Sequence, residues 1–189
     1  MNGPNAADPE TIVDYITGNA VPNIGAEANR QAVERLLVET KGYARQEIVV
    51  DAPIELQMAD GPYRSRLDLV VRLQGYGYMV IKCAPGSLAS REREVIAAAR
   101  LLAPYQLPLA VASDGATAIV WDAVSGKRLG QGLAAVPTRQ QALAAFDPLR
   151  LMPLAESRRS RQQLIFRSYD SMNVHRSGDP DDGSNSDQR

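Results

Sequence analysis

Cysteine and histidine are almost missing from this sequence, and their scarcity excludes several kinds of site. Of the 189 residues, one is a cysteine, Cys83, and one is a histidine, His175. A single cysteine cannot form an internal disulfide framework or a cysteine-rich zinc site. A single histidine in a polar C-terminal stretch argues against histidine-based catalytic triads and histidine-ligated metals. Any chemistry is therefore expected from carboxylate, lysine and arginine side chains.

Long apolar runs are also lacking. No stretch of about 18 or more apolar residues occurs, so no membrane-spanning helix is expected. The N-terminus MNGPNAADPE has neither a basic region nor an apolar run, and no export signal is expected. With 44% hydrophobic and 23% charged residues, the composition fits one compact domain with extensions and excludes a collagen or a coiled coil. We expect a soluble cytoplasmic protein.

Charge is spread unevenly along the chain, although the formal net charge is only -1. The net charge is -6 over residues 1–60, +4 over 61–130, +3 over 131–170 and -2 over 171–189. A positive middle can offer a local anion-binding face, while ordinary surface charge is the plain alternative. Lysine is rare, because only Lys41, Lys82 and Lys127 stand among 21 basic residues. The place of each lysine is therefore informative.

The pattern of apolar residues predicts a mixed α/β fold. The expected elements are a helix over 26–40, strands over 47–58, 66–73 and 78–84, a helix after Ser87, strands over 108–113 and 117–122, and helices near 138–146 and 156–168. Short links between the first three strands favour an antiparallel meander, and Pro53 favours an edge position for the first of them. The helix after Ser87 is then a crossover to the next strand. The prediction is a mixed sheet flanked by helices.

Composition divides the chain into four parts. We expect a loose N-terminal arm over 1–23 with a short helix near 11–17, an α/β domain over 24–136, C-terminal helices over 137–170, and a disordered tail over 171–189. His175 falls in this tail.

The pair Asp68 and Lys82 on neighbouring predicted strands is the most informative feature. Strict alternation puts Asp68 and Val70 on one face of their strand, with Leu67 and Leu69 on the other. Lys82 lies in a run otherwise without charge, where a lysine needs a partner or an opening to solvent. A structural salt bridge is one interpretation of this pair. A catalytic cleft, in which Asp68 holds a divalent cation and Lys82 stabilises an attacking hydroxide or a phosphate, is the other.

The segment after Lys82 adds a possible phosphate contact. The sequence CAPGSLASRERE is a glycine turn that leads into the start of a helix, where free backbone amides and the helix dipole attract anions. The candidate contacts are Gly86, Ser87, Ser90, Arg91 and Arg93.

The order of these elements resembles the PD-(D/E)XK nuclease superfamily. In particular, residues 26–135 resemble the N-terminal domain of type I restriction enzyme R subunits in a stand-alone form. The matching stretches are EANRQAVERLLVETKGY, RSRLDLVV, MVIKCAPGS and the helix that follows. The resemblance implies a restriction-endonuclease-like core of helix, three-stranded meander, helix and strands.

The resemblance also implies an activity and site residues. Asp68 corresponds to the first metal-binding acid of the family and Lys82 to its motif lysine. Family members bind Mg²⁺ (or Mn²⁺) and hydrolyse DNA phosphodiesters through a metal-activated water. The first helix often supplies another acid, for which Glu27 and Glu34 are the candidates.

The sequence departs from the family pattern at Val80, where the family has its second acid. In one explanation the acid has moved to the helix after Ser87, where Glu92 or Glu94 could reach the strand ends. Residues two apart on a helix face different ways, and Glu92 is preferred because it lies closer to the helix start. Glu55 is a further option, since a symmetric turn over 58–64 would put it opposite Asp68. In the other explanation the site is inactive.

Two functions follow from this reasoning. The first is a metal-dependent DNA phosphodiester hydrolase related to restriction, defence or repair, with Asp68, Lys82 and Glu92 as catalytic residues and Asp68, Glu92, Glu34 and Glu27 as metal ligands. The alternative is a catalytically inactive nuclease-fold module that binds nucleic acid or a partner protein. DNA is the expected partner, with a protein partner or a homodimer as further options. No nucleotide cofactor is expected, because Trp121 replaces the glycine of a phosphate loop before Lys127.

Overall fold

A computed structural model of the chain describes residues 10–174. Its strands are β1 (Thr11–Val13), β2 (Ala20–Pro22), β3 (Ile48–Met58), β4 (Gly61–Leu73), β5 (Tyr76–Cys83), β6 (Leu109–Ser113), β7 (Ala118–Asp122) and β8 (Arg128–Gln131). Its α-helices are α1 (Glu27–Arg35), α2 (Glu92–Leu101), α3 (Arg139–Ala145) and α4 (Glu156–Val174). A π-helical segment, Leu36–Thr40, extends α1, and 3₁₀ turns lie at Arg45–Glu47, Leu88–Arg91, Leu133–Ala135 and Pro148–Arg150.

One six-stranded mixed sheet organises the domain. The strand order is β3-β4-β5-β6-β7-β8, with β5 and β6 parallel and all other neighbours antiparallel. The predicted meander of β3, β4 and β5 is confirmed, and β3 with Pro53 lies at the edge of the sheet. The segment with α2 is the crossover that a parallel pair requires. The predicted fold class, a restriction-endonuclease-like mixed α/β core, is therefore confirmed.

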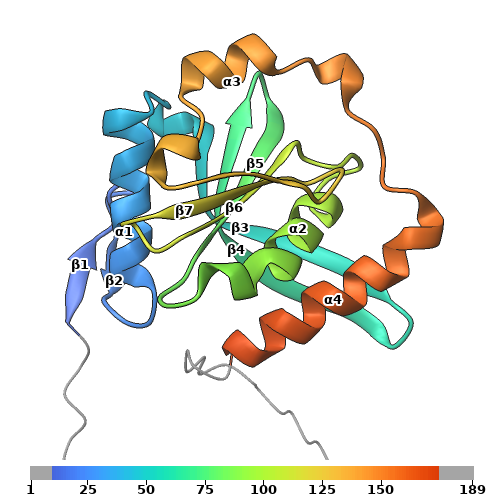
Figure 1. Ribbon diagram of the computed structural model, residues 1–189. Coiled ribbons are helices and arrows are strands. Elements are labelled where there is room, and N and C mark those ends of the chain that lie inside the picture. Colours follow the sequence, from blue (N-terminus) through green and yellow to red (C-terminus); the bar gives the residue numbers. More distant parts are fainter. Residues whose placement is uncertain (1–9, 175–189) are drawn as a thin grey trace, which may run out of the picture.

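Helices cover both faces of the sheet, so that the domain has three layers (Figure 1). On the α1–α3 face, Val33 of α1 packs in one apolar cluster with residues of the sheet and with Phe146, which follows α3. On the α2–α4 face, Val95 of α2 and Phe166 of α4 pack in a second cluster. Figure 1 shows α4 lying across α2. The helical residues at spacings of three and four turn their apolar stripes toward the sheet.

Strand β5 follows the predicted alternation. Met79, Ile81 and Cys83 pack on the α1–α3 face, and Val80 packs on the α2–α4 face. Both faces of this strand are therefore covered, which explains its almost uninterrupted apolar sequence.

Strand β4 departs from the predicted alternation at one point. Leu67 was expected beside Leu69, but it packs on the α2–α4 face, whereas Leu69 packs on the α1–α3 face. The pairing of β3 with β4 is interrupted between these leucines, where Asp51 of β3 has a φ of 50°. A positive φ outside glycine bends the strand locally, and the phase of the alternation changes there.

The prediction of a helix near residues 11–17 is wrong. This segment forms a small hairpin of β1 and β2, which pair from Thr11↔Pro22 to Val13↔Ala20. The carboxylate of Asp14 accepts hydrogen bonds from the backbone amides of Ile16 and Thr17 and holds the turn. Such aspartate turns compete with helix formation.

The C-terminal helix is longer than predicted. Helix α4 continues through Val174, so residues 171–174 are helical rather than part of a disordered tail. The rest of the predicted tail, with His175, lies outside the described residues, as does the start of the predicted arm. Within residues 10–174 no helix is long and apolar enough to cross a bilayer.

The tight turn between β4 and β5 yields a prediction about stability. Gln74 and Gly75 connect these strands with φ values of 52° and 84°. Such two-residue turns favour Asn-Gly, and a glutamine with positive φ is strained. We expect Gln74→Asn to raise the free energy of unfolding by about 0.5–1 kcal/mol, measured by urea denaturation. The same change at exposed Gln57 within β3 should give no gain, and an equal gain there would contradict this account.

Candidate functional site

Asp68 and Lys82 lie where strands β4 and β5 separate. The paired residues of the two strands run as far as Leu69 and Ile81, and Asp68 and Lys82 are the next positions. There the backbone amide of Cys83 donates a hydrogen bond of 2.6 Å to the Asp68 carboxylate. The Asp68 side chain thus accepts a hydrogen bond from a β5 backbone amide that has no backbone partner on β4.

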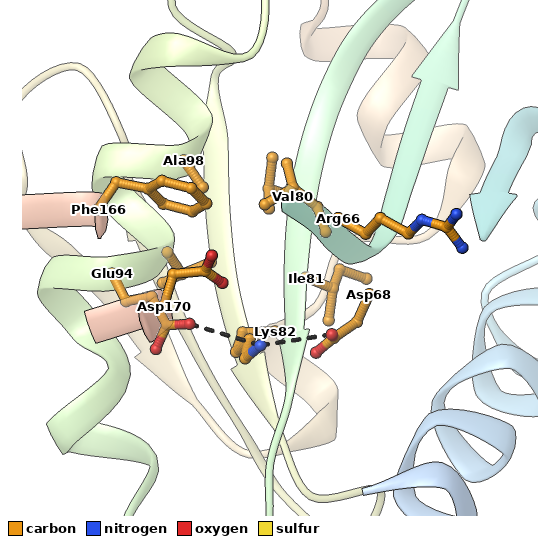
Figure 2. Close-up of a pocket in the computed structure, with 11 residues that line it drawn as sticks. Arg66, Asp68, Val80, Ile81, Lys82, Glu94, Ala98, Phe166 and Asp170 are labelled. Atoms are coloured by element: carbon orange, nitrogen blue, oxygen red, sulfur yellow. Dashed lines mark hydrogen bonds and ion pairs between the residues drawn. The ribbon is translucent and has the colours of Figure 1, made fainter. Parts of the chain in front are cut away.

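Lys82 lies between carboxylates from different elements. Its Nζ is 3.4 Å from Asp68 Oδ1 and 3.4 Å from Glu94 Oε1. Figure 2 shows it between Asp68 on one side and the acids of α2 and α4, Glu94 and Asp170, on the other. Only 18% of its side chain is exposed. Burial alone lowers the pKa of Lys82, but attraction to these carboxylates, first to Asp68, outweighs burial and raises the pKa. The amine is therefore charged.

Glu94, rather than Glu92, is the acid that helix α2 brings to this site. Glu94 is buried, and its second carboxylate oxygen is 3.5 Å from the Arg91 guanidinium. Glu92 is exposed. The prediction that Glu92 rather than Glu94 lies at the strand ends is therefore wrong. A 3₁₀ turn, Leu88–Arg91, precedes α2 and sets the helix phase so that its third residue points inward.

Arg30 of α1 forms a second ionic centre. Its guanidinium makes two hydrogen bonds to Glu27, of 3.0 and 2.8 Å, and lies 3.3 Å from Asp51 of β3. It also lies 3.2 Å from Asp14 of the N-terminal hairpin. The predicted metal ligands Glu27 and Glu34 both face this guanidinium, Glu34 at 3.9 Å.

Glu34 is the most deeply buried acid of this centre. Its side chain is 0% exposed, its carboxylate lies 3.9 Å from Arg30, and a backbone amide, that of Ile16, acts to lower its pKa. Burial first, and then the negative charge of Asp14, raises the pKa of Glu34 to about 7. Burial of an ionised carboxylate is costly, so the protonated acid is favoured below about pH 7.

A pocket of about 420 Å³ connects the two ionic centres. The hairpin and the start of α1 form one wall, and the end of β5 forms another. Its lining residues are Val21, Pro22, Ile24, Gly25, Ala26, Glu27, Arg30, Asp51, Asp68, Lys82, Cys83, Ala84, Pro85 and Arg91. The pocket therefore presents three basic and three acidic side chains beside an apolar wall.

Of the five predicted phosphate contacts, Arg91 alone lines the pocket. Gly86 is exposed with a φ of 85°, and Ser90 Oγ donates to the backbone carbonyl of Ser87 at 2.7 Å. Arg91 lines the pocket, whereas Arg93 is exposed on α2. The structure therefore brings Arg91 to the site and leaves the other four at the surface.

Two placements differ from the sequence-based expectations. Glu55 pairs across the sheet with Arg64, not Asp68, because the turn after β3 consists of residues 59 and 60 only. Asp51 stands at the register position opposite Asp68 instead. Sequence reasoning also missed Asp170, which accepts a hydrogen bond of 2.7 Å from the Tyr63 hydroxyl.

The signal for Arg30 was present in the sequence. Glu27, Arg30 and Glu34 follow the i, i+3 and i+7 spacing of one helix face, which predicts ion pairs around the arginine. The contributions of Asp14 and Asp51 depend on the hairpin and on the bend in β3, for which the sequence carries no comparable pattern.

The carboxylates do not fit the metal that the family resemblance implies. Within residues 10–174 no group of three or more Asp, Glu, His or Cys side chains is arranged to hold an ion. Val80 occupies the position of the second acid and packs in the apolar core. Asp68 and Glu94 are engaged by Lys82, and Glu27 by Arg30. Mg²⁺ needs several oxygen ligands at about 2.0–2.1 Å, and these carboxylates are instead arranged around internal cations.

Comparison with known proteins identifies a family. The model of the type I restriction enzyme R protein N terminus matches residues 25–137, more than half of the chain. The superfamily resemblance inferred from the motifs is consistent with this match. No curated protein and no solved structure matches the chain.

The first prediction from this site concerns Lys82. Lys82→Met keeps the length of the side chain but leaves Asp68 and Glu94 without their shared cation. Breaking a buried pair from one side is strongly destabilising, and we expect a loss of about 3 kcal/mol in urea unfolding at neutral pH. Lys127→Met, at an exposed position, is the control and should have little effect. Equal effects of the two substitutions would refute the role of Lys82.

The second prediction concerns pH. Because the pKa of Glu34 is about 7 in the folded chain and its ordinary value is 4.5, the folded chain keeps a proton that the unfolded chain loses. Glu34 therefore makes stability fall as pH rises from about 4.5 to about 7, with no further change above. Glu34→Gln should remove this part of the slope in unfolding measured across this range, and Glu92→Gln should not. An unchanged slope in Glu34→Gln would contradict the assignment.

Proposed function

The chain belongs to the family of the type I restriction enzyme R protein N terminus, and on this premise we propose that it is a nuclease-fold module that binds DNA without hydrolysing it. The family suggests a nuclease-related role. The finer assignment, binding without metal-dependent hydrolysis, rests on the arrangement of charge in the site.

One observation carries this proposal: the acids of the site are neutralised by the protein's own cations. Lys82 contacts Asp68 and Glu94, each at 3.4 Å. In a hydrolytic site of this fold, a metal would be held by two acids and would activate a water. Here the second acid of the motif is Val80, which is 2% exposed and cannot ligate. The site keeps an acid and a lysine on neighbouring strands but has no second carboxylate at position 80 to hold a metal.

Arginines around the site supply the contact to DNA. Arg66 of β4 and Arg93 of α2 are exposed, and Arg91 lines the pocket and contacts Glu94 at 3.5 Å. Exposed arginines bind phosphate oxygens in bidentate fashion and release condensed counterions from DNA. Since the pocket itself also presents Asp51 and Asp68, we place the DNA backbone on the rim rather than inside the pocket.

A second candidate, metal-dependent hydrolysis, is favoured by one observation. Glu94 arrives from α2 and meets the same amine as Asp68, from the opposite side of Lys82 (Figure 2). This is the placement expected of a migrated acid, although it is Glu94 and not Glu92 that occupies it. Mg²⁺ or Mn²⁺ would be required, and Asp68 and Glu94 would have to release Lys82 to hold it.

One experiment separates these functions. The wild-type chain is incubated with plasmid DNA and with short fluorescent duplexes in Mg²⁺ or Mn²⁺, and binding of the duplexes is measured by fluorescence anisotropy at several salt concentrations. We expect binding that weakens with salt and no cleavage. Arg93→Gln should weaken binding and reduce the salt slope by about 1, because it removes one phosphate contact.

Arg128→Gln, at an exposed position on the far edge strand β8, is the matched control and should bind like the wild type. Cleavage that requires metal and is lost in Asp68→Ala would overturn the proposal in favour of the hydrolase. Absence of DNA binding even at low salt would overturn it in favour of a protein partner.

A further inference from the structure

We infer that Arg30 is a built-in cation that takes the place of a bound metal ion and fastens the N-terminal hairpin to the domain. The inference goes beyond the proposed function, since it assigns a cation-binding role to four carboxylates that surround this guanidinium. It also accounts for the mismatch between the implied metal and the residues present.

Four carboxylates from three parts of the chain converge on Arg30. Glu27 and Glu34 come from α1, Asp51 from β3 and Asp14 from the hairpin turn. The nitrogen–oxygen distances are 2.8 Å to Glu27, 3.2 Å to Asp14, 3.3 Å to Asp51 and 3.9 Å to Glu34. One monovalent group thus contacts as many acids as a divalent ion with carboxylate ligands commonly does.

The guanidinium is enclosed, as a structural ion would be. The Arg30 side chain is 8% exposed, and Asp14 and Glu34 are buried completely or nearly so. Asp51 is the most exposed of the four acids, with 53% of its side chain exposed at the pocket, and Glu27 is 12% exposed. Acids buried this closely repel one another unless a cation lies between them. Arg30 supplies this charge permanently, because an arginine does not lose its proton in proteins.

The backbone is also adapted to this centre. Asp51 holds a φ of 50°, a conformation that aspartate adopts at a cost, and its carboxylate faces Arg30. Asp14 uses one oxygen to hold the hairpin turn and the other to contact Arg30 and Gln31. The hairpin, which forms the apolar wall of the pocket through Val21 and Pro22, is therefore attached to α1 through this cation.

The inference predicts a latent metal site. With Arg30 present, the guanidinium occupies the space among the four acids, and no group of three or more Asp, Glu, His or Cys side chains in residues 10–174 is arranged to hold an ion. Arg30→Met keeps the aliphatic stem and removes the charge, so that the acids gain space and those that are ionised, with Glu27, Asp14 and Asp51 beside the guanidinium, need another cation. A small divalent ion then binds the folded chain and not the unfolded one.

The experiment measures thermal unfolding without DNA, so its result is independent of the binding and cleavage assays. The wild type should have the same Tm in EDTA, Mg²⁺ and Mn²⁺ at matched ionic strength. Arg30→Met should unfold at lower temperature in EDTA and regain about 5–10 °C at Mn²⁺ concentrations near 100 times its Kd. Hydrogen exchange at residues 11–22 should be faster in Arg30→Met and slow again with Mn²⁺.

The control is Arg35→Met, one turn further along α1 and 55% exposed, which should show no response to metal. If Arg30→Met is unfolded in EDTA, addition of Mn²⁺ should refold it, as followed by circular dichroism. Saturable Mn²⁺ binding that raises the Tm of the wild type would overturn the inference. So would an Arg30→Met chain, folded or unfolded, that does not respond to either metal.

Discussion

The pairing of buried carboxylates with two internal cations, Arg30 and Lys82, is the interaction on which this structure depends. Arg30 joins the N-terminal hairpin, α1 and β3, and Lys82 joins β4, β5 and α2. These elements belong to both helical layers, so the two cations fix the layers to the sheet near one end of β5. The apolar clusters supply most of the favourable burial, but they do not specify which strand ends meet. Buried ion pairs are well suited to fix such positions, because a displaced partner leaves an uncompensated charge.

The same ion pairs stabilise the fold but occupy the carboxylates that a metal-dependent nuclease would use. A nuclease centre needs carboxylates that are free to hold an ion, whereas a rigid scaffold needs them paired. In this chain the pairing of β4 with β5 ends beside Asp68 and Lys82, Val80 packs in the apolar core, and Glu94 is held by Lys82 and Arg91. The fold alone therefore does not determine the function, which depends on the residues of the site.

The sheet could be predicted from the sequence, but the exact composition of the site could not. Short links determine the meander, and period-2 alternation determines the facing of Lys82 in β5, because both are local properties of extended chains. The alternation of β4 changes phase at Asp68, between Leu67 and Leu69, so the sequence did not determine the facing of this residue. The choice between Glu92 and Glu94 depends on a 3₁₀ turn of four residues that sets the helix phase, and no periodicity reveals it. Glu55 was misplaced because the actual turn is only two residues long, and one error in the centre of a turn moves every pairing. Asp14 and Asp170 reach their positions only through contacts with distant elements, with Arg30 and with Tyr63.

The connection between β5 and β6 has a consequence for how the domain assembles. Strands β3, β4 and β5 are joined by turns of two residues and contact one another locally, whereas β6 pairs in parallel with β5 only after the whole segment with α2 has crossed the sheet. Local pairings close small loops and form early, while distant pairings pay more entropy. During synthesis the meander also leaves the ribosome before α2 and β6. We therefore expect a partly folded chain in which Asp68 and Lys82 already lie near each other and Glu94 has yet to arrive, so that this ionic centre is completed only when α2 docks on the sheet.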